Sequence, residues 1–311
     1  SAGKPAKVLA DWQKYKIPIS VEKFEPLNKD DISMAHDPKY VEGVFSLRIA
    51  NGFGNRLKEV ADSLYWTNGS FAGAARYAIK NQTQAVSPTS GFHHAGYSSG
   101  GGFCTFNGLV IAAQILKNEG VIVAHVVSST LFAKKCEEAG VDAVVAEGFE
   151  AGGHNGREET TTFCLIPQVK RSISIPLIAA GGISSRESYL ASFVLGADGV
   201  QIGTRFALCK ESSAHELFKE RCRSLPEGDT RLLLKKIGPT RMVYNHFCEQ
   251  VQQAEDMGAS ADALRELLSK GRSKKGIFEG DMIEGQLEIG QIASMVTKEE
   301  SVKDIFEDLC R

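Results

Sequence analysis

The sequence lacks several features that would assign the protein to a special class. No apolar run approaches the roughly eighteen residues that a membrane-spanning helix needs, and the opening SAGKPAK lacks the apolar core of a secretory signal. The net charge of −2 shows no excess of either sign, so we expect neither nucleic acid nor a membrane as a partner. The seven cysteines contain no C-x-x-C pair, which indicates reduced thiols. We therefore expect a cytoplasmic protein that acts on a small molecule.

Internal repeats, low-complexity segments and a G-x-G-x-x-G dinucleotide fingerprint are also missing from the sequence. Apolar residues make up 42% and charged residues 24% of the 311 positions, which is ordinary for a globular protein. This length allows one large domain or two modest ones.

The region from about residue 38 to 118 carries mostly helical signals. Apolar residues recur at helical spacing in YVEGVFSLRIANG (40–52), GNRLKEVADSLYW (54–66), SFAGAARYAIKNQ (70–82) and NGLVIAAQILKNEG (107–120). The run TQAVSP (83–88) is the one good extended segment among them. This part of the chain is therefore predicted to be helix-rich.

After Gly120 the pattern alternates between strand and helix. Strands are predicted in VIVAHVV (121–127), DAVVAEG (142–148), IPLIAAGG (175–182) and DGVQIG (198–203), and LFAKKCEEAG, CLIPQVKRSI and RESYLASFVLGA are the helices between them. The first strand is rich in β-branched residues, as expected for a strand buried on both faces. Four strands with three helical crossovers predict a parallel α/β sheet or barrel. From Ser212 onward we expect only helices.

Glycines follow the last two predicted strands directly. Gly181 and Gly182 end one strand, and Gly203 with Thr204 ends the next. Such glycines let the backbone approach a ligand, and free N–H groups near the next helix attract an anion. In (β/α)8 barrels the loops after strands seven and eight commonly bind phosphate. We therefore predict a phosphate site here, although tight turns alone would also favour glycine.

The loop after the second strand, EGFEAGGHNG (147–156), brings His154 toward the same edge of the sheet. A histidine there can serve as acid, base or hydrogen-bond donor near neutral pH. His154 is therefore a candidate catalytic residue.

These segments resemble a known family. GVDAVVAEGFEAGGHNG, IPLIAAGGI, GADGVQIGTRF and GQIASMVTKEE are similar to the C-terminal part of the nitronate monooxygenase family, which includes FMN-dependent enoyl-acyl carrier protein reductases, over roughly residues 121–311. The resemblance implies a (β/α)8 barrel that binds FMN and makes His154 the active-site histidine. The implied cofactor-binding residues are Ala151, Gly152, Gly153, Gly181, Gly182, Gly203, Thr204, Gly290 and Gln291.

Half of such a barrel is missing from the sequence. Members of the family begin with strands one to four and a glycine-rich QGGM-type segment beneath the flavin ring, and the first 120 residues carry neither. A half barrel leaves two unpaired edges and an uncovered apolar interior. Either the first 120 residues or a second copy of the chain, in a homodimer, is expected to cover them.

The first part of the chain contains SGFHHAGYSSGGGFC (90–104), with two adjacent histidines among glycines. On these residues alone, a hydrolytic pair and a polar surface loop are equally plausible. This stretch and HDPKYVEGV resemble an early segment of the histone deacetylase family over roughly residues 1–119. The resemblance implies that His93 and His94 are the acid/base pair and that Phe103 is a wall of the acyl channel. The zinc ligands of that family, an Asp-x-His pair and a further Asp, have no counterpart here, and no metal ligands are predicted.

The sequence thus resembles two incomplete families joined near residues 117–121. A natural fusion, an engineered chimera and an assembly from two sources all remain open. The predicted fold is α/β: the C-terminal part of a (β/α)8 (TIM) barrel with a helical C-terminal extension, preceded by a helix-rich α/β segment of the arginase or deacetylase type. The expected parts are a deacetylase-like segment (1–119), barrel strands with phosphate-binding loops (120–211) and a helical part (212–311).

The predicted function is that of an FMN-dependent oxidoreductase that oxidises a nitronate or reduces an enoyl thioester. Two alternatives remain open. One is a zinc-dependent deacetylase-like amide hydrolase that lacks recognisable metal ligands, and the other is an inactive hybrid in which neither active site is complete.

Overall fold

The computed structural model describes residues 4–89, 92–269 and 271–311. The chain divides into two compact units, Ser1–Val123 and Ala124–Arg311. Residues 1–3, with which the expected first segment begins, lie outside the described part of the chain. Within that part, no helix combines the length and the apolar character that crossing a membrane requires.

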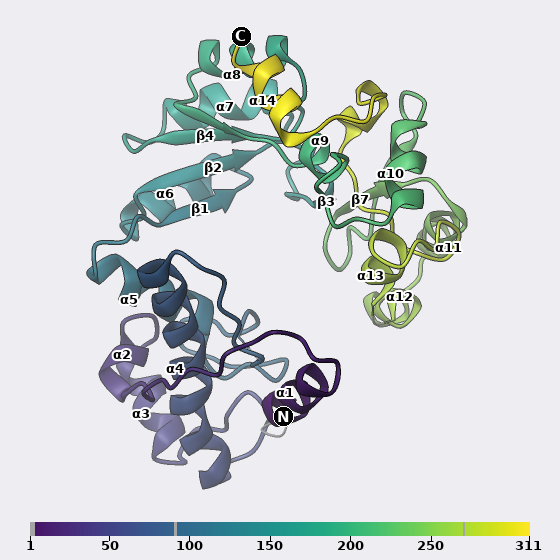
Figure 1. Cartoon of the computed structure of the whole chain (residues 1–311). Coiled ribbons are helices and arrows are strands. Elements are labelled where there is room, and N and C mark those ends of the chain that lie inside the picture. The colour runs from purple at the N-terminus through teal and green to yellow at the C-terminus, as the bar shows by residue number, and fades with distance from the viewer. Residues whose placement is uncertain (1–3, 90–91, 270) are drawn as a thin grey trace. The chain divides into compact units, whose positions relative to one another are not determined.

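The first unit is built from helices (Figure 1), which are α1 (Lys4–Lys14), α2 (Lys29–Ser33), α3 (Pro38–Phe45), α4 (Lys58–Asn81) and α5 (Gly108–Asn118). Asn107 begins α5 by accepting a hydrogen bond from the backbone N–H of Val110, as the sequence pattern predicts. The apolar face of α5 carries Ile111 and Ile115, which are buried in one core with residues of α3 and α4. This core holds the first unit together.

Two local predictions for the first unit were wrong. The two helices expected at 54–66 and 70–82 form the single helix α4. The helix expected to reach Gly52 ends at Phe45, because the chain turns into the left-handed region at Leu47, with φ 62°. The run 83–88, predicted to be extended, contains no helix and joins no sheet among the described residues. Each error concerns a boundary that tertiary packing decides.

The second unit contains the predicted parallel sheet. Its strands β1 (Ala124–Val127), β2 (Ala143–Glu147), β4 (Leu177–Ala180) and β5 (Gly199–Gln201) pair in that order, all parallel. Helices α6 (Thr130–Glu138), α7 (Thr162–Lys170) and α8 (Arg186–Val194) connect them. The predicted alternation of strand and helix is confirmed, and it brings the carboxyl ends of all four strands to one edge.

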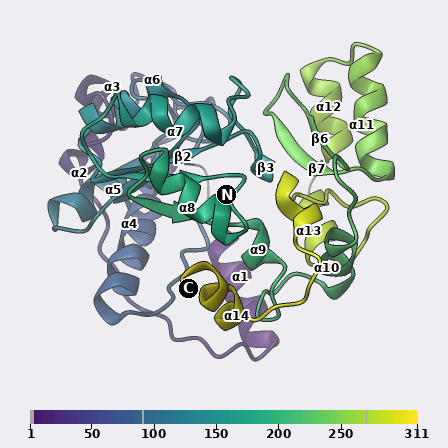
Figure 2. The ribbon, with the colours of Figure 1, turned by 90° about the horizontal axis from the view of Figure 1, so that it is seen from above.

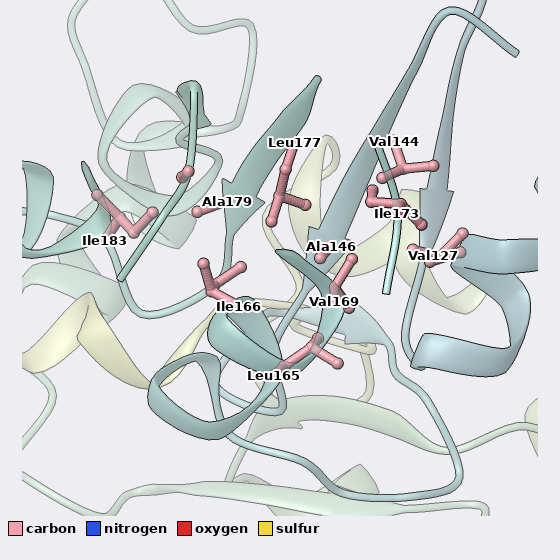
Figure 3. Packing of buried hydrophobic residues seen from close by; sticks show 12 residues of the cluster. Val127, Val144, Ala146, Leu165, Ile166, Val169, Ile173, Leu177, Ala179 and Ile183 are labelled. Atoms are coloured by element: carbon pink, nitrogen blue, oxygen red, sulfur yellow. The ribbon is translucent and has the colours of Figure 1, made fainter. Parts of the chain in front are cut away.

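Helices α6 and α7 cover one face of this sheet with an apolar core. The core includes Ala146 of β2, Leu177 of β4 and Ile166 of α7, each with an exposed fraction of 0%. Figure 3 shows Ile166 and Val169 of α7 beside these strand residues. The strand residues alternate along each strand, so burial of this face fixes the register of the sheet.

The first strand is shorter and more exposed than the sequence predicted. Residues 121–127 were expected to be buried on both faces, but β1 covers only Ala124–Val127, and only Val127 of the strand is buried. Val126 is 46% exposed. Because β1 is an edge of the sheet, it has a neighbouring strand on one side only.

A second sheet of three antiparallel strands lies further along the chain, in the order β3 (Gly153–His154), β7 (Thr240–Val243) and β6 (Thr230–Leu233). The prediction of only helices after Ser212 was therefore wrong, because β6 and β7 lie in that part. Both strands have four residues, and their partner β3 is distant in sequence, so the local pattern gives no strong strand signal. Figure 2 shows this sheet beside α11 and α12.

The remaining helices of the second unit surround these two sheets. They are α9 (Thr204–Ala207), α10 (Glu216–Arg223), α11 (His246–Asp256), α12 (Ala261–Leu268), α13 (Arg272–Ile277) and α14 (Val302–Leu309), with one 3₁₀ turn, η1 (Gln291–Met295). The helix α14 packs on α8 and α9, and η1 packs on α9 and α10. The C-terminal region therefore returns to the parallel sheet.

We expect Leu177→Ala to lower the free energy of unfolding by about 2–5 kcal/mol, because the substitution opens a cavity at a fully buried position. Leu190→Ala on α8 is the matched control, since Leu190 is 47% exposed and its truncation should change stability by at most about 0.5 kcal/mol. Urea unfolding followed by far-UV circular dichroism measures both. Equal effects of the two substitutions would contradict this account of the core.

Candidate functional site

A cavity of about 300 Å³ lies in the second unit, at the carboxyl ends of β2, β4 and β5. Its volume is at the lower end of the range for small-molecule sites. Seven residues predicted from the sequence line it: Ala151, Gly152, Gly153, Gly181, Gly182, Gly203 and Thr204. The structure thus brings together three loops that are far apart in the sequence.

The turn after β4 requires glycine. Gly181 and Gly182 have φ values of 84° and 70°, a conformation that side chains disfavour. A Cβ atom on Gly181 would lie 2.7 Å from the carbonyl oxygen of Gly148 in the neighbouring loop. The two loops are therefore in backbone contact, and no larger residue fits between them.

Two backbone donors of these loops are free to bind a ligand. Within the described chain, the N–H groups of Gly182 and Gly203 donate no hydrogen bond. An added Cβ on Gly203 would meet no atom within 4 Å, so the space beside it is open. Exposed backbone N–H groups in Gly-rich turns are the donors that phosphate oxygens bind in many proteins.

The segment around Gly290 closes one wall of the cavity. The N–H of Gly290 donates to Oγ1 of Thr204 at 3.0 Å, and the N–H of Gln291 donates to the carbonyl oxygen of Glu150 at 2.9 Å. A Cβ on Gly152 would lie 2.4 Å from the carbonyl carbon of Ile289. Gly290 and Gln291 thus do not line the cavity; they hold the residues that do.

Three carboxylates at the cavity were not identified from the sequence: Glu147, Glu150 and Glu288. Oxygens of Glu150 accept from the backbone N–H and the hydroxyl of Thr162 at the start of α7, at 3.0 to 3.1 Å. Glu288 accepts from the hydroxyl of Ser273 at 2.6 Å. Both carboxylates are therefore held in place by neutral donors.

Glu147 differs from the other two. Its carboxyl makes no hydrogen bond within the described residues, and burial raises its pKa above the ordinary value of 4.5. The sequence did carry a signal for it, since Glu147 is a charged residue directly after the apolar run AVVA. Burial at the end of a parallel strand favours the neutral acid at this position.

His154 lies beside the cavity and does not line it. The residue is exposed, forms strand β3 with Gly153 and pairs with Thr240 of β7. The next residue, Asn155, donates through its side-chain amide to the carbonyl oxygens of Ala151 and Gly153, at 2.9 and 3.1 Å. The backbone that carries His154 is therefore continuous with the cavity wall and tied to it.

His93, His94 and Phe103 lie in the first unit and are exposed, with Phe103 at 70%. The two imidazole rings are 4.0 Å apart between centroids, and Phe103 contacts the ring of Phe53. Among the residues that the structure describes, no three His, Cys, Asp or Glu side chains cluster closely enough to hold a metal ion. The histidine pair therefore does not fit a zinc site.

We expect Glu147→Gln to stabilise the protein at neutral pH and to lose this advantage in acid. The folded pKa of Glu147 is raised, so the folded state binds the proton more tightly than the unfolded state, and stability falls as the pH rises from the ordinary carboxyl pKa through the raised one. Glutamine has no carboxyl proton to lose, so the variant does not lose stability as the pH rises. Thermal melts of both proteins across this pH range measure the effect. A melting-temperature difference that is the same at every pH would contradict it.

The chain is similar to known families over both of its parts. The nitronate monooxygenase family profile matches residues 108–311, and the histone deacetylase domain profile matches residues 5–127. The probable nitronate monooxygenase of Bacillus subtilis (strain 168) is 33% identical over 208 residues, which are 64% of this chain and 60% of that protein. The chain thus spans less than two thirds of this relative. Both resemblances predicted from the sequence are confirmed.

Solved structures agree with this comparison. FabK from Thermotoga maritima is 39% identical, with a TM-score of 0.60 over 63% of this chain and 62% of that chain. Nitroalkane oxidase from Streptomyces ansochromogenes has a TM-score of 0.55 over 78% of this chain and 77% of that chain, and its 24% identity shows likeness of fold alone. The predicted fold is confirmed: the chain is α/β, and its parallel sheet is the C-terminal part of a (β/α)8 barrel.

The family match covers more than half of the chain, and it includes the three glycine-containing loops that form the cavity. The part of the chain that this match covers also agrees in fold with the solved structures. The chain belongs to the nitronate monooxygenase family.

Proposed function

We propose that the protein is an FMN-dependent oxidoreductase that oxidises a nitronate or reduces an enoyl thioester. The observation that carries this proposal is the cradle of glycine loops at the carboxyl edge of the parallel sheet. It offers free backbone N–H donors at Gly182 and Gly203, with open space beside Gly203 and the Glu150 side chain beside Gly182. This arrangement fits the phosphate of a mononucleotide cofactor.

The residues of the cavity divide between the two ends of such a cofactor. Gly181, Gly182, Gly203 and Thr204 would hold the phosphate, while Ala151–Gly153 would line the flavin. Gly290 and Gln291 would act from behind the wall, through their bonds to Thr204 and Glu150. A bound flavin supplies electron transfer, and the protein binds and orients it.

We assign the proton-transfer role to His154. An imidazole can serve as acid or base near neutral pH. The antiparallel pairing with Thr240 and the amide bonds of Asn155 keep its backbone fixed beside the cavity. Its exposed side chain can exchange the proton with water.

The zinc hydrolase alternative is not supported by the donor set. Hydrolytic zinc needs about three protein ligands and an open position, and His93 and His94 lack a third ligand among the described residues. We therefore derive no step through a metal. The inactive hybrid remains the alternative that the absence of bound flavin would favour.

We further propose a division of labour along the chain. Residues 1–119 form a deacetylase-like segment, 120–211 supply the barrel strands and phosphate loops, and 212–311 complete the cavity wall. The proposed location is the cytoplasm, where either the first 120 residues or a second copy of the chain, in a homodimer, covers the open sheet edges. The support for the dimer is that β1 and β5 are unpaired edges in the described sheet, and the support for the compartment is the seven free thiols.

Gly203→Asp should abolish FMN retention, because its carboxylate would face the phosphate. Gly203→Asn is the matched control: it has nearly the same size without the charge, and the protein leaves room for either side chain. We expect FMN affinity to fall at least about tenfold further for Asp than for Asn. The visible flavin spectrum retained after desalting measures both variants and the parent protein. A colourless parent protein would refute the proposed function itself.

His154→Ala should retain FMN and turn over about a hundredfold more slowly, which is the scale of a lost acid/base group. Steady-state rates with a nitronate and with an enoyl thioester, measured on flavin-loaded protein, test this expectation. If the variant lost its flavin, His154 would belong to the cofactor site and the assignment would be wrong.

A further inference from the structure

Among the residues that the structure describes, Arg241 is the largest fully buried side chain, and none of the roles above involves it. It lies in strand β7, and its side chain is among those least accessible to solvent, with the residue 2% exposed. Within the described chain no carboxylate forms an ion pair with it. Burial lowers the pKa of Arg241, and the nearby charges of Glu150 and Glu159 offset this only in part, so an apolar side chain would fill the same space at less cost.

The guanidinium instead binds one residue of the cavity loop, Phe149. Its Nε and Nη2 donate to the carbonyl oxygen of Phe149, at 3.2 and 2.8 Å, and its plane lies over the Phe149 ring, 4.5 Å from the centroid. The third nitrogen, Nη1, donates to Oγ1 of Thr230 on β6, at 3.2 Å. Because the guanidinium binds the Phe149 carbonyl through two nitrogens and also stacks on its ring, it fixes both the position and the rotation of Phe149.

The backbone of the same residue holds the other end of that loop. Arg241 pairs with Gly153 in the antiparallel ladder between β3 and β7. The residues between these two attachment points, Glu150–Gly153, are those that line the cavity. One residue therefore fixes both ends of the cavity loop.

We propose that Arg241 is the positioning residue of the cofactor site, and that its grip on Phe149 sets the position of Glu150–Gly153 against the flavin. This inference rests on the proposed function for the identity of the ligand. Arg241 does not line the cavity, so it acts through the loop and not by direct contact.

A matched control lies on the neighbouring strand. Arg231 of β6 also donates to backbone carbonyls, those of Gly228 and Thr230, and also stacks on an aromatic ring, that of Tyr244 at 5.2 Å. It touches no residue of the cavity loop in these contacts. Arg231→Met therefore removes the same charge and the same type of contact from the same sheet.

The experiment compares Arg241→Met, Arg241→Lys and Arg231→Met in the full chain, with two measurements. FMN titration gives the dissociation constant and the visible circular dichroism of the bound flavin. Hydrogen exchange of peptides covering residues 148–156, in FMN-free protein, reports the order of the loop directly.

We expect Arg241→Met to weaken FMN binding and to speed loop exchange, each by about tenfold or more, because bonds from a charged donor are lost. It should also alter the dichroism of any flavin that remains bound. Arg241→Lys keeps the positive charge but loses the planar pair of N–H donors, so this variant should fold and keep only part of the FMN affinity. Arg231→Met should resemble the parent protein in both measurements.

The inference is overturned if Arg241→Met folds and matches Arg231→Met in affinity and exchange. Should Arg241→Met fail to fold, Arg241→Lys decides the question. If this variant has the FMN affinity and the loop exchange of the parent protein, the guanidinium contacts with Phe149 do not position the loop. If the parent protein itself binds no FMN, the proposed function fails, and the exchange of residues 148–156 still supports or refutes the grip of Arg241 on the loop.

Discussion

The site depends on one packing constraint, the burial of α6 and α7 against a single face of the parallel sheet. Each strand places alternate residues in that core, so a shift of one residue would expose the apolar set and bury the other face. With the register fixed, the ends of β2, β4 and β5 reach the same edge. The glycine loops that follow these strands then meet in space, although lining residues Ala151 and Thr204 are 53 positions apart (204 − 151).

Where these loops meet, the backbones are too close for side chains. Gly181 lies against Gly148, and Gly152 lies against Ile289, at distances that no Cβ could occupy. The glycines therefore serve two purposes: they let the loops pack together, and they leave the N–H groups of Gly182 and Gly203 without a hydrogen-bond partner in the described chain. The polar side chains around them act from outside, with Thr162 holding Glu150 and Arg241 holding Phe149. The cavity wall is thus a backbone surface supported by buried polar contacts.

The two family matches overlap at residues 108–127, and the overlap contains α5. Both family profiles match this helix in the sequence, because an amphipathic helix that ends before a glycine is compatible with either family. In the structure, Ile111, Ala112 and Ile115 of α5 are buried in the core of the first unit. Packing thus assigns the helix to the unit that precedes the parallel sheet, and the barrel strands begin at Ala124.

The sequence by itself determined the four parallel strands, their helices and the glycine loops, because these depend on local periodicity and on residues with special backbone freedom. It also indicated seven of the residues that line the cavity. Only the tertiary structure decided the rest. Strands β6 and β7 form because they pair with each other and with β3. Glu147 is half-buried at its strand end, which raises its pKa. Arg241 contacts Phe149 across more than ninety residues. Pairing and burial at such sequence separations leave no local pattern, since they arise from where the folded chain brings distant segments together.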